Sequence, residues 1–548
     1  MAHKSTTDQI FTLDTIIDCR TANNKPTWCA FLDLRKAFDS VPRRLLLQTM
    51  MKRGVEGKTI NMISAMMKDE WSSIIMNDQP QKWIHIQKGV RQGGCVSPLA
   101  FNFIPNELAI RLKQKNYGVQ LGPDVNIGLL LYADDIVLIS ESKVNLQKLC
   151  HEVEEWAREF KLTINEDKSE VMCFNEACKG SVRINGNILK VSNNFRYLGF
   201  ILGKRVKDIK HFENRLRSMR VASGAFLGIL NAMKSITIST KRQMVQACIN
   251  SVALYATEAA SREEITERII AEMEKIQRRG LRVILNSPQA TANETHLIDL
   301  GMMSVRALLD KRALLFRAKV SNAKEGSILK NLVKINYEEK LGWEKRCRDL
   351  LDKYGLDDCM LLGEENLKRW RRKMHMAIWK ADREWCIQRM REETWKTTTL
   401  FCDMNAVTWK MAEYTKLNPK DVNGAREIFR LRAGFNCTNL CQFIRHQTKN
   451  AICEHCDWQI QDEKHLIEDC PRFNNERTKL LMNLKTYIDS DEDLNLMDVV
   501  LDSWRYEEKK NKLELTRNQV DEIDAHAKEF IKIITKSKKL RRLGRDKT

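Results

Sequence analysis

Two adjacent aspartates interrupt an otherwise apolar stretch, and this feature constrains the fold more than any other. Asp134 and Asp135 stand between the apolar residues 129–133 and 136–139. Short apolar runs on both sides of a polar pair are typical of a β-hairpin whose strands are buried. The tip of such a hairpin aims both carboxylates into one cleft. An isolated Asp-Asp pair is more often a solvated loop tip, so its context must decide between the two interpretations.

A third acid in a similar setting is Asp33. It ends the apolar run 29–32 and precedes a helical pattern, so it is expected to point the same way as Asp134 and Asp135. Carboxylates that converge at about 4 Å repel by roughly 4 kcal/mol per pair at an effective dielectric near 20, and a divalent cation removes this penalty. Two Mg²⁺ ions about 3.5–4 Å apart clamp an in-line phosphoryl displacement. The three acids therefore predict Mg²⁺-dependent nucleotidyl transfer.

The first two hundred residues alternate short apolar runs with helical patterns, which predicts an α+β fold. The expected strands are 28–34, 72–76, 128–131 and 136–140, and the expected helices are 42–53, 58–68, 98–113 and 144–160. Residues 181–202 are expected to hold three short strands around the turn Asn185-Gly186. No strand pattern is found in 205–430, and the second half of the chain is predicted to be mostly helical.

Charge and composition indicate the class of partner. The chain has 548 residues, enough for about two to four domains, and 92 Lys and Arg against 72 Asp and Glu give a net charge of +20. A polyanionic partner is the first interpretation, and a generic basic protein is the alternative. The 16 cysteines are irregularly spaced and no signal-like start precedes them, so we expect reduced thiols and a nuclear and cytoplasmic protein. No apolar run approaches the ~18 residues of a membrane helix.

The ordered motifs FLDLRKAFDSV (31–41), GVRQGGCVSPLAFNF (89–103) and YADD (132–135) resemble the reverse transcriptase motifs of non-LTR retrotransposons, or LINE elements. The similarity continues through FKLTINEDKSEV (160–171) and FRYLG (195–199), and weakly through 255–258 and 277–282. It covers most of residues 5–475. The resemblance implies an RNA-directed DNA polymerase that copies element RNA into cDNA by target-primed synthesis, with an RNA template, a DNA primer or target and dNTPs as partners.

The resemblance also implies a role for individual residues. Asp33, Asp134 and Asp135 match the Mg²⁺-binding catalytic triad, and Lys168 is a candidate proton donor to pyrophosphate. Phe38 matches the aromatic residue that rejects a 2′-OH, although its alternative is a core aromatic. The expected substrate-binding residues are Phe38, Gln92, Gly93 and Tyr132, and the expected primer grip is Tyr197, Leu198 and Gly199.

The same resemblance implies a right-hand polymerase followed by a helical region. The expected parts are partial fingers and palm at 1–204, a helical thumb or connection at 205–330, a helical basic region at 331–430, a zinc knuckle at 431–480 and a helical basic tail at 481–548. The sequence opens partway through the family's fingers and shows no nuclease pattern. The alternative function is therefore a catalytically impaired, polymerase-derived RNA-binding protein. A maturase of the group II intron type is a weaker alternative.

A cysteine–histidine cluster predicts one structural zinc ion. Cys453, Cys456, His465 and Cys470 form C-x2-C-x8-H-x4-C, a spacing suited to tetrahedral Zn²⁺. Rival ligands lie close by in the sequence, at Cys437, Cys441, His446 and His455. The family resemblance favours the first set, because many LINE proteins carry such a knuckle, and it implies contact with the template RNA.

Two further basic segments are candidate nucleic-acid surfaces. Residues 368–379, with Trp385 and Trp395 beyond, interleave cations with tryptophans on one expected helix. The favoured interpretation is that the tryptophans are core and the cations a solvated face. In the C-terminal run, Lys538, Lys539, Arg541 and Arg542 suggest a backbone contact, a nuclear address or a solvated tail.

Overall fold

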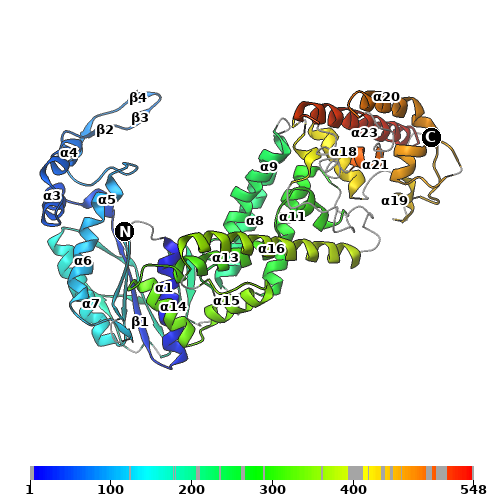
Figure 1. Cartoon of the computed structure of the whole chain (residues 1–548). Helices are drawn as coiled ribbons and strands as arrows, with labels where there is room; N and C mark the ends of the chain where they lie inside the picture. Colours follow the sequence, from blue (N-terminus) through cyan, green and yellow to red (C-terminus); the bar gives the residue numbers. More distant parts are fainter. Residues whose placement is uncertain are drawn as a thin grey trace.

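The computed structural model describes residues 5–545 except for a number of gaps. The gaps are 123–124, 177, 179, 205–209, 234–235, 261–265, 288–290, 360–361, 393–410, 418, 434–437, 445–447, 458, 489–495 and 502–514. The described residues form a mixed α/β N-terminal part and a helical remainder (Figure 1).

A five-stranded sheet organises the N-terminal part, in the order β13-β10-β1-β9-β8. Its members are β1 (Thr27–Leu34), β8 (Leu129–Tyr132), β9 (Asp135–Ser140), β10 (Ile164–Phe174) and β13 (Lys190–Val191). β1 lies at the centre and pairs antiparallel with both β9 and β10. Trp28 and Ala30 face one hydrophobic core, while Cys29 and Phe31 face another. Burial on both faces explains why this strand reads as a continuous apolar run.

Helices cover the two faces of this sheet (Figure 1). Helices α3 (Arg43–Lys52), α4 (Gly57–Met67), α5 (Ser97–Phe101), α6 (Phe103–Lys113) and α7 (Lys143–Glu159) contribute to the core on one face. The other face packs on α1 (Thr6–Ala22), and α1 in turn contacts α14 (Ile328–Glu338) and α15 (Gly342–Lys353). The Phe11 and Trp343 rings lie 4.7 Å apart, so α1 joins the sheet to the helical remainder.

Most predicted elements of this part are confirmed, with three corrections. The predicted helix 98–113 is wrong as one helix, because it breaks at Asn102 into α5 and α6. The predicted strand 72–76 is two short strands, β2 (Trp71–Ser72) and β3 (Ile75–Met76). The stretch expected to hold three strands holds five. They are β11 (Arg183–Ile184), β12 (Asn187–Ile188), β13, β14 (Asn194–Tyr197) and β15 (Phe200–Gly203).

One hairpin stands away from the body of the molecule (Figure 1). β2 pairs with β5 (Ile84–His85), and β3 pairs with β4 (Gln79–Pro80). The turn residues Asn77 and Asp78 have φ values of 48° and 60°, as a type I′ hairpin turn requires. We call residues 70–86 the arm. A smaller hairpin joins β6 (Val119–Gly122) to β7 (Val125–Ile127).

The described residues after 210 are almost entirely helical, and no named strand occurs among those up to 430, as predicted. The long helices are α8 (Lys210–Ala232), α11 (Glu267–Leu285), α13 (Val305–Ser321), α16 (Glu364–Glu392) and α23 (Arg517–Arg545). Shorter ones are α2 (Ala37–Ser40), α9 (Ile238–Val245), α10 (Ser251–Ala253), α12 (Asn293–Asp299), α18 (Val422–Arg432), α19 (Asn439–Ile444), α20 (Asn474–Lys485) and α21 (Leu496–Leu501). Single turns of other helix types are η1 (Gln246–Asn250), η4 (Glu413–Thr415), η5 (His465–Asp469) and η6 (Pro471–Phe473).

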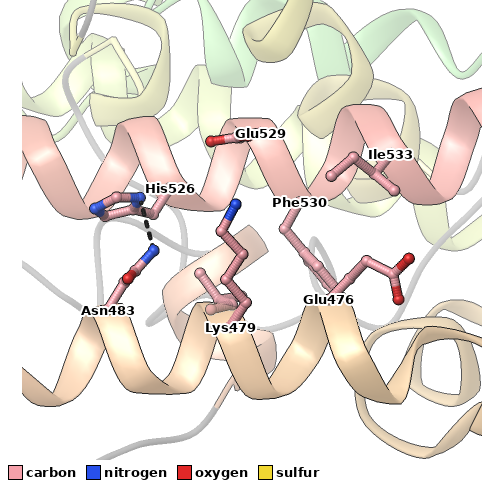
Figure 2. A pocket seen from close by; sticks show the side chains of 8 residues that line it. Glu476, Lys479, Asn483, His526, Glu529, Phe530 and Ile533 are labelled. Carbon is pink, nitrogen blue, oxygen red and sulfur yellow. Dashed lines mark hydrogen bonds between the residues drawn. The ribbon is translucent and has the colours of Figure 1, made fainter.

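The C-terminal helices share one core with the helices that follow the sheet. This core runs from Phe212 on α8 to Ile534 on α23. Near its surface α20 packs along α23. There Asn483 Nδ2 and His526 Nδ1 lie 3.2 Å apart, beside a cavity of about 40 Å³ (Figure 2). Among the described residues no helix is both long and apolar enough to span a bilayer.

Candidate functional site

The predicted acidic hairpin is confirmed. β8 and β9 pair antiparallel up to Tyr132 and Asp135, which leaves Ala133 and Asp134 as the turn. Ala133 has a φ of 53°, the left-handed conformation that a tight hairpin turn needs. Ile136, Val137 and Leu138 are at most 1% exposed, whereas Asp134 and Asp135 are partly exposed. The buried strands therefore hold a fixed, solvent-accessible acidic tip.

Asp33 lies beside this tip at the end of the neighbouring strand. The last pair between β1 and β9 joins Leu32 to Ile136, so Asp33 and Asp135 are the next residues on each strand. Burial, together with the nearby charges of Asp134 and Asp33, raises the pKa of Asp135 to about 6. The structure thus brings the three predicted carboxylates together at one edge of the sheet. A carboxylate set that repels in this way is a suitable donor set for a divalent cation.

Two residues that the sequence interpretation missed hold Asp33 in place. The Asn165 side-chain amide donates to Asp33 Oδ2 at 2.9 Å. The Asp33 backbone N–H donates to Ser169 Oγ at 3.2 Å, and the Ser169 hydroxyl donates to the Asn165 carbonyl at 2.7 Å. These contacts leave Asp33 Oδ1 without a bond to either residue. The only sequence signal was that Asn165 and Ser169 fall within a motif of the resembled family.

An irregularity in β10 makes this arrangement possible. β1 pairs Phe31 with Glu170 and Asp33 with Asn165, so residues 166–169 oppose a single residue of β1. Lys168 lies in this excursion and is exposed. Its predicted role as a proton donor stays a prediction.

The loop after β5 is fastened to the segment that follows Asp33. Gly89 N–H donates to the Val41 carbonyl and Val90 N–H to the Phe38 carbonyl, both at 2.8 Å. A Cβ at Gly89 would lie 2.7 Å from the Asp39 carbonyl oxygen, and Gly89 has a φ of 86°. Only glycine fits this close approach without strain.

Gln92 and Gly93 extend from this fastened loop. The Gln92 amide donates to Asp39 Oδ1 at 3.1 Å, and both Gln92 and Gly93 are exposed. Gln92 also borders an open cavity of about 940 Å³ at the base of the arm. Of the two predicted substrate-binding residues in this loop, Gln92 is therefore accessible from that cavity.

Phe38 has a packing role. Its ring stacks on Phe101 at 4.4 Å and contacts the core between the sheet and its helices. It is only partly buried, so part of its surface stays accessible. Its predicted contact with the sugar stays a prediction.

The turn at Tyr197, Leu198 and Gly199 joins β14 to β15. Leu198 and Gly199 have φ values of 45° and 80°. The Tyr255 hydroxyl donates to the Leu198 carbonyl at 2.6 Å, and a Cβ at Gly199 would lie 3.1 Å from the Tyr255 ring. Tyr197 is 3% exposed, and burial together with the charge of Asp135 raises its pKa. The turn therefore stands close to the acidic tip.

Three of the four predicted zinc ligands come together, and the fourth, Cys470, contacts one of them. Within the described residues, one group of His, Cys, Asp or Glu side chains has three potential ligand atoms that all lie within 4.8 Å of one another. It consists of Cys453, Cys456 and His465. Cys453 Sγ lies 3.8 Å from Cys470 Sγ, and Cys456 Sγ lies 3.5 Å from His465 Nε2. Around tetrahedral zinc, bonds of about 2.3 Å to sulfur and 2.0–2.1 Å to nitrogen separate two sulfurs by about 3.8 Å and sulfur from nitrogen by about 3.6 Å. These two separations are compatible with zinc, and Cys453, Cys456 and His465 are the three donors close enough to share one ion.

Neighbouring groups support these ligands. The Gln461 amide donates to Cys453 Sγ at 3.0 Å and the His455 backbone N–H donates to it at 3.4 Å. Burial raises the pKa of the Cys453 thiol, but these hydrogen bonds outweigh burial and the pKa is lower than usual. Arg477 on α20 donates to the carbonyls of Ile467 and Cys470. The cluster is thereby tied to the helical core.

Of the rival ligands, His455 is described, and it lies outside the group of Cys453, Cys456 and His465. The His455 ring packs edge-on against Phe473 at 5.5 Å. Cys437 and His446, and the side chain of Cys441, lie outside the described residues.

On α16, Trp370 and Trp379 are 5% and 9% exposed, while Lys368, Arg369, Arg371 and Arg372 are exposed. The favoured interpretation, core tryptophans beneath a solvated basic face, is confirmed for these two. Trp395 and the side chains of Lys538, Lys539, Arg541 and Arg542 lie outside the described residues.

Comparison with known proteins identifies the N-terminal part of the chain. Residues 1–202 match the family model described as reverse transcriptase (RNA-dependent DNA polymerase). A retrovirus-related Pol polyprotein from type-1 retrotransposable element R2 of Popillia japonica is 28% identical over 200 residues, 35% of this chain and 33% of that protein. An RNA-directed DNA polymerase from mobile element jockey of Drosophila funebris is 25% identical over 239 residues, 41% of this chain and 25% of that protein. The matches thus span a third or less of these relatives.

Among solved structures, a telomerase from Candida albicans in complex with a fragment of telomeric RNA aligns with a TM-score of 0.34 and 9% identity, over 64% of this chain and 54% of that one. An apo telomerase from Candida tropicalis aligns with a TM-score of 0.31 and 13% identity, over 59% and 56%.

Proposed function

We propose that the protein is an RNA-directed DNA polymerase of the non-LTR retrotransposon type, which copies element RNA into cDNA by target-primed synthesis. The observation that carries this proposal is the set of three carboxylates at one edge of the sheet, with the pKa of Asp135 raised to about 6. A reverse transcriptase domain that retains this set has the donors that nucleotidyl transfer requires. RNA template, DNA primer and dNTPs are the substrates.

In this proposal Asp33, Asp134 and Asp135 hold two Mg²⁺ ions. When bound, such ions activate the primer hydroxyl and neutralise charge on the leaving pyrophosphate. Asn165 orients Asp33 for this task, through the bond to Asp33 Oδ2 at 2.9 Å. Because the β9 strand behind the acidic tip is buried, the carboxylates need little rearrangement to receive the ions.

Other residues position the nucleotide and the primer. Gln92 and Gly93 contact the incoming dNTP, and the loop that carries them is braced on the Phe38 segment. Phe38 and Tyr132 limit the space at the sugar. The turn at Tyr197, Leu198 and Gly199 holds the primer end, where it is backed by Tyr255. Lys168 supplies a proton to pyrophosphate.

The fold that accompanies this function is a right-hand polymerase. The sheet and its helices form the palm and a fingers region within 1–204, and α8, α9 and α11 contribute to the thumb within 205–330. Cys453, Cys456, His465 and Cys470 bind one structural zinc ion, which the sulfur–sulfur distance of 3.8 Å supports. A net charge of +20 suits an enzyme whose substrates are polyanions.

The test is primer extension by the purified full chain. We expect extension of a DNA primer on an RNA template with Mg²⁺ and dNTPs, and no extension in EDTA. The second candidate, an RNA-binding protein without catalysis, is favoured by the positive charge and the exposed basic face of α16. It predicts RNA binding that weakens steeply with salt but no extension, and that result would replace the polymerase proposal.

A further inference from the structure

The arm carries tryptophans in an unusual setting. Eight tryptophans lie within the described residues. Trp28, Trp156, Trp343, Trp370 and Trp379 are buried, and Trp385 is partly buried. Trp71 and Trp83 are 55% and 57% exposed, and both lie on the arm. A large aromatic ring left in water on a projecting hairpin is a candidate contact for a partner.

Two aromatic rings of the arm pack against each other. Trp71 pairs directly with His85 across β2 and β5, and their ring centroids lie 4.8 Å apart at 34°. Trp83 lies two residues before His85 on the same leg of the arm and is exposed. The paired Trp71 and His85 rings form a platform on which planar groups can stack, and Trp83 adds a third exposed ring to the arm.

The platform is built on a rigid base. Arg43 donates to the carbonyls of Gly89 and Ile86, at 3.0 and 2.7 Å, and also bonds the Met67 carbonyl and Glu70. The Ile86 N–H donates to the Glu70 carbonyl at 2.8 Å. Arg43 thus joins both legs of the arm to the loop that carries Gln92, and its own charge is satisfied there.

The Trp71 and His85 rings share a cavity with Gln92. Trp71 and His85 line the cavity of about 940 Å³, together with Asp39, Lys88, Arg91 and Gln92. Gln92 and Asp39 are joined by a hydrogen bond of 3.1 Å beside the segment that follows Asp33. A chain that leaves the nucleotide site through this cavity meets the aromatic rings next.

Exposed cations accompany the rings. Lys82, Lys88 and Arg91 are exposed, and no ion pair joins them to an acid within the described part of the chain. Glu70, at the base of the arm, is engaged by Arg43. Aromatic platforms flanked by cations are how proteins hold single-stranded nucleic acid, since rings stack on bases and cations pair with phosphates. A protein partner would not require this combination.

We propose that the arm binds the unpaired template strand ahead of the polymerase site, with bases stacked on Trp71, His85 and Trp83. The inference rests on the proposed polymerase function, because the template is that function's substrate. It adds a second contact for the template that lies outside the catalytic centre. Lys82, Lys88 and Arg91 pair with the phosphates of the same strand.

The test compares two primer–template duplexes that differ only in the unpaired template extension, about two nucleotides against about twelve. Binding is measured by fluorescence anisotropy of the labelled primer without dNTPs. The unmodified protein should bind the long extension more tightly. Trp71→Ala and Trp83→Ala should each weaken binding of the long extension by about tenfold and leave the short one within about twofold.

Matched variants identify the chemistry of the contact. Met482 on α20 is 65% exposed, so Met482→Ala controls for loss of an exposed apolar side chain elsewhere. Trp71→Leu keeps apolar surface but removes the wide ring, and it should weaken binding of the long extension. Trp71→Phe should retain part of that binding. Full binding by Trp71→Leu would mean that the arm does not act by stacking, and would overturn the proposal.

Two further outcomes separate the proposals from each other. Primer extension that persists while Trp71→Ala and Trp83→Ala bind long extensions normally would overturn the inference and leave the polymerase intact. Absence of extension in the unmodified protein would overturn the polymerase, while the anisotropy data would still report on the arm.

Self-association in sedimentation velocity that Trp71→Ala abolishes would make the arm an interface between two copies and would overturn template binding.

Discussion

At the scale of single residues, the site depends on how each carboxylate is held. Asp134 and Asp135 owe their position to the hairpin turn, which is local in sequence and was predictable from the apolar runs around them. Asp33 owes its orientation to Asn165, which is 132 positions away. Such a contact depends on the irregular register of β10, and no local sequence pattern predicts it. The acids were therefore predictable, whereas their supports were not.

Asn165→Ala should lower polymerase activity by about 10- to 100-fold, because loss of the amide frees Asp33 to rotate, as for other groups that orient metal ligands. The melting temperature should change little, since Asn165 is only partly buried. Steady-state extension kinetics measure the effect. Asn187→Ala, which removes an exposed amide bonded to Glu166, serves as control. Unchanged kinetics in Asn165→Ala would contradict the proposed support of Asp33.

The pKa of about 6 at Asp135 predicts a pH dependence of Mg²⁺ binding. Below that pKa the carboxyl holds a proton that must leave before the ion binds, so Mg²⁺ affinity should rise with pH up to about 6 and then level off. The Mg²⁺ concentration for half-maximal extension, measured from pH 5 to 8, tests this. In Asp33→Asn the pH at which the Mg²⁺ affinity levels off should be lower. Mg²⁺ titrations followed by calorimetry measure this shift. A flat profile would contradict the convergence of the three acids.

At the scale of elements, the site is assembled by the way loops are fastened together. The loop with Gln92 is pinned to the segment after Asp33 by two backbone hydrogen bonds and by the contact of Gly89 with Asp39. The helices and strands that flank the site followed from periodicity. The break of the predicted helix 98–113 at Asn102 did not, because apolar spacing continues across it and tertiary packing decides the direction of each half.

Gly89→Ala should destabilise the protein by more than about 1 kcal/mol, because a φ of 86° is strained for alanine and its Cβ meets the Asp39 backbone at 2.7 Å. It should also raise the KM for dNTPs, since the loop would move away from the site. Gly54→Ala is the matched control, because Gly54 has a φ of 84° but no atom within 4 Å of its Cβ. Equal unfolding free energies for the two variants in urea would show that the close approach is unimportant.

At the scale of the whole molecule, one helical core links the segments after α8 to the zinc-ligand cluster. Cys453 and Cys470 belong to the same core as residues of α11, α18 and α23. The grouping of Cys453, Cys456 and His465 was predictable from their spacing. The attachment of the cluster through Arg477 was not, because it joins α20 to carbonyls of another segment. The helical character of the second half was predictable, whereas its packing requires long-range contacts that a sequence pattern does not encode.

Zinc removal should loosen this C-terminal part. Binding of a structural zinc ion is worth about 10–16 kcal/mol in small modules, so Cys456→Ser or a strong chelator should expose residues around the cluster to limited proteolysis. Mass spectrometry of the metal content should give one zinc per chain. Cys248→Ser is the control, because Cys248 is exposed and lies outside the cluster. Retention of zinc in Cys456→Ser would contradict the proposed ligand set.

The central claim is that Asp33, Asp134 and Asp135 form a polymerase centre, and single-turnover incorporation of one dNTP on an RNA template tests it most directly. The unmodified protein and Glu364→Gln, which changes an exposed acid on α16, should incorporate at equal rates. In Asp134→Asn the rate of incorporation should fall by at least about a thousandfold, which corresponds to roughly 4 kcal/mol of transition-state stabilisation. Template binding by Asp134→Asn should be unchanged. Incorporation by Asp134→Asn at the rate of the unmodified protein would contradict the claim.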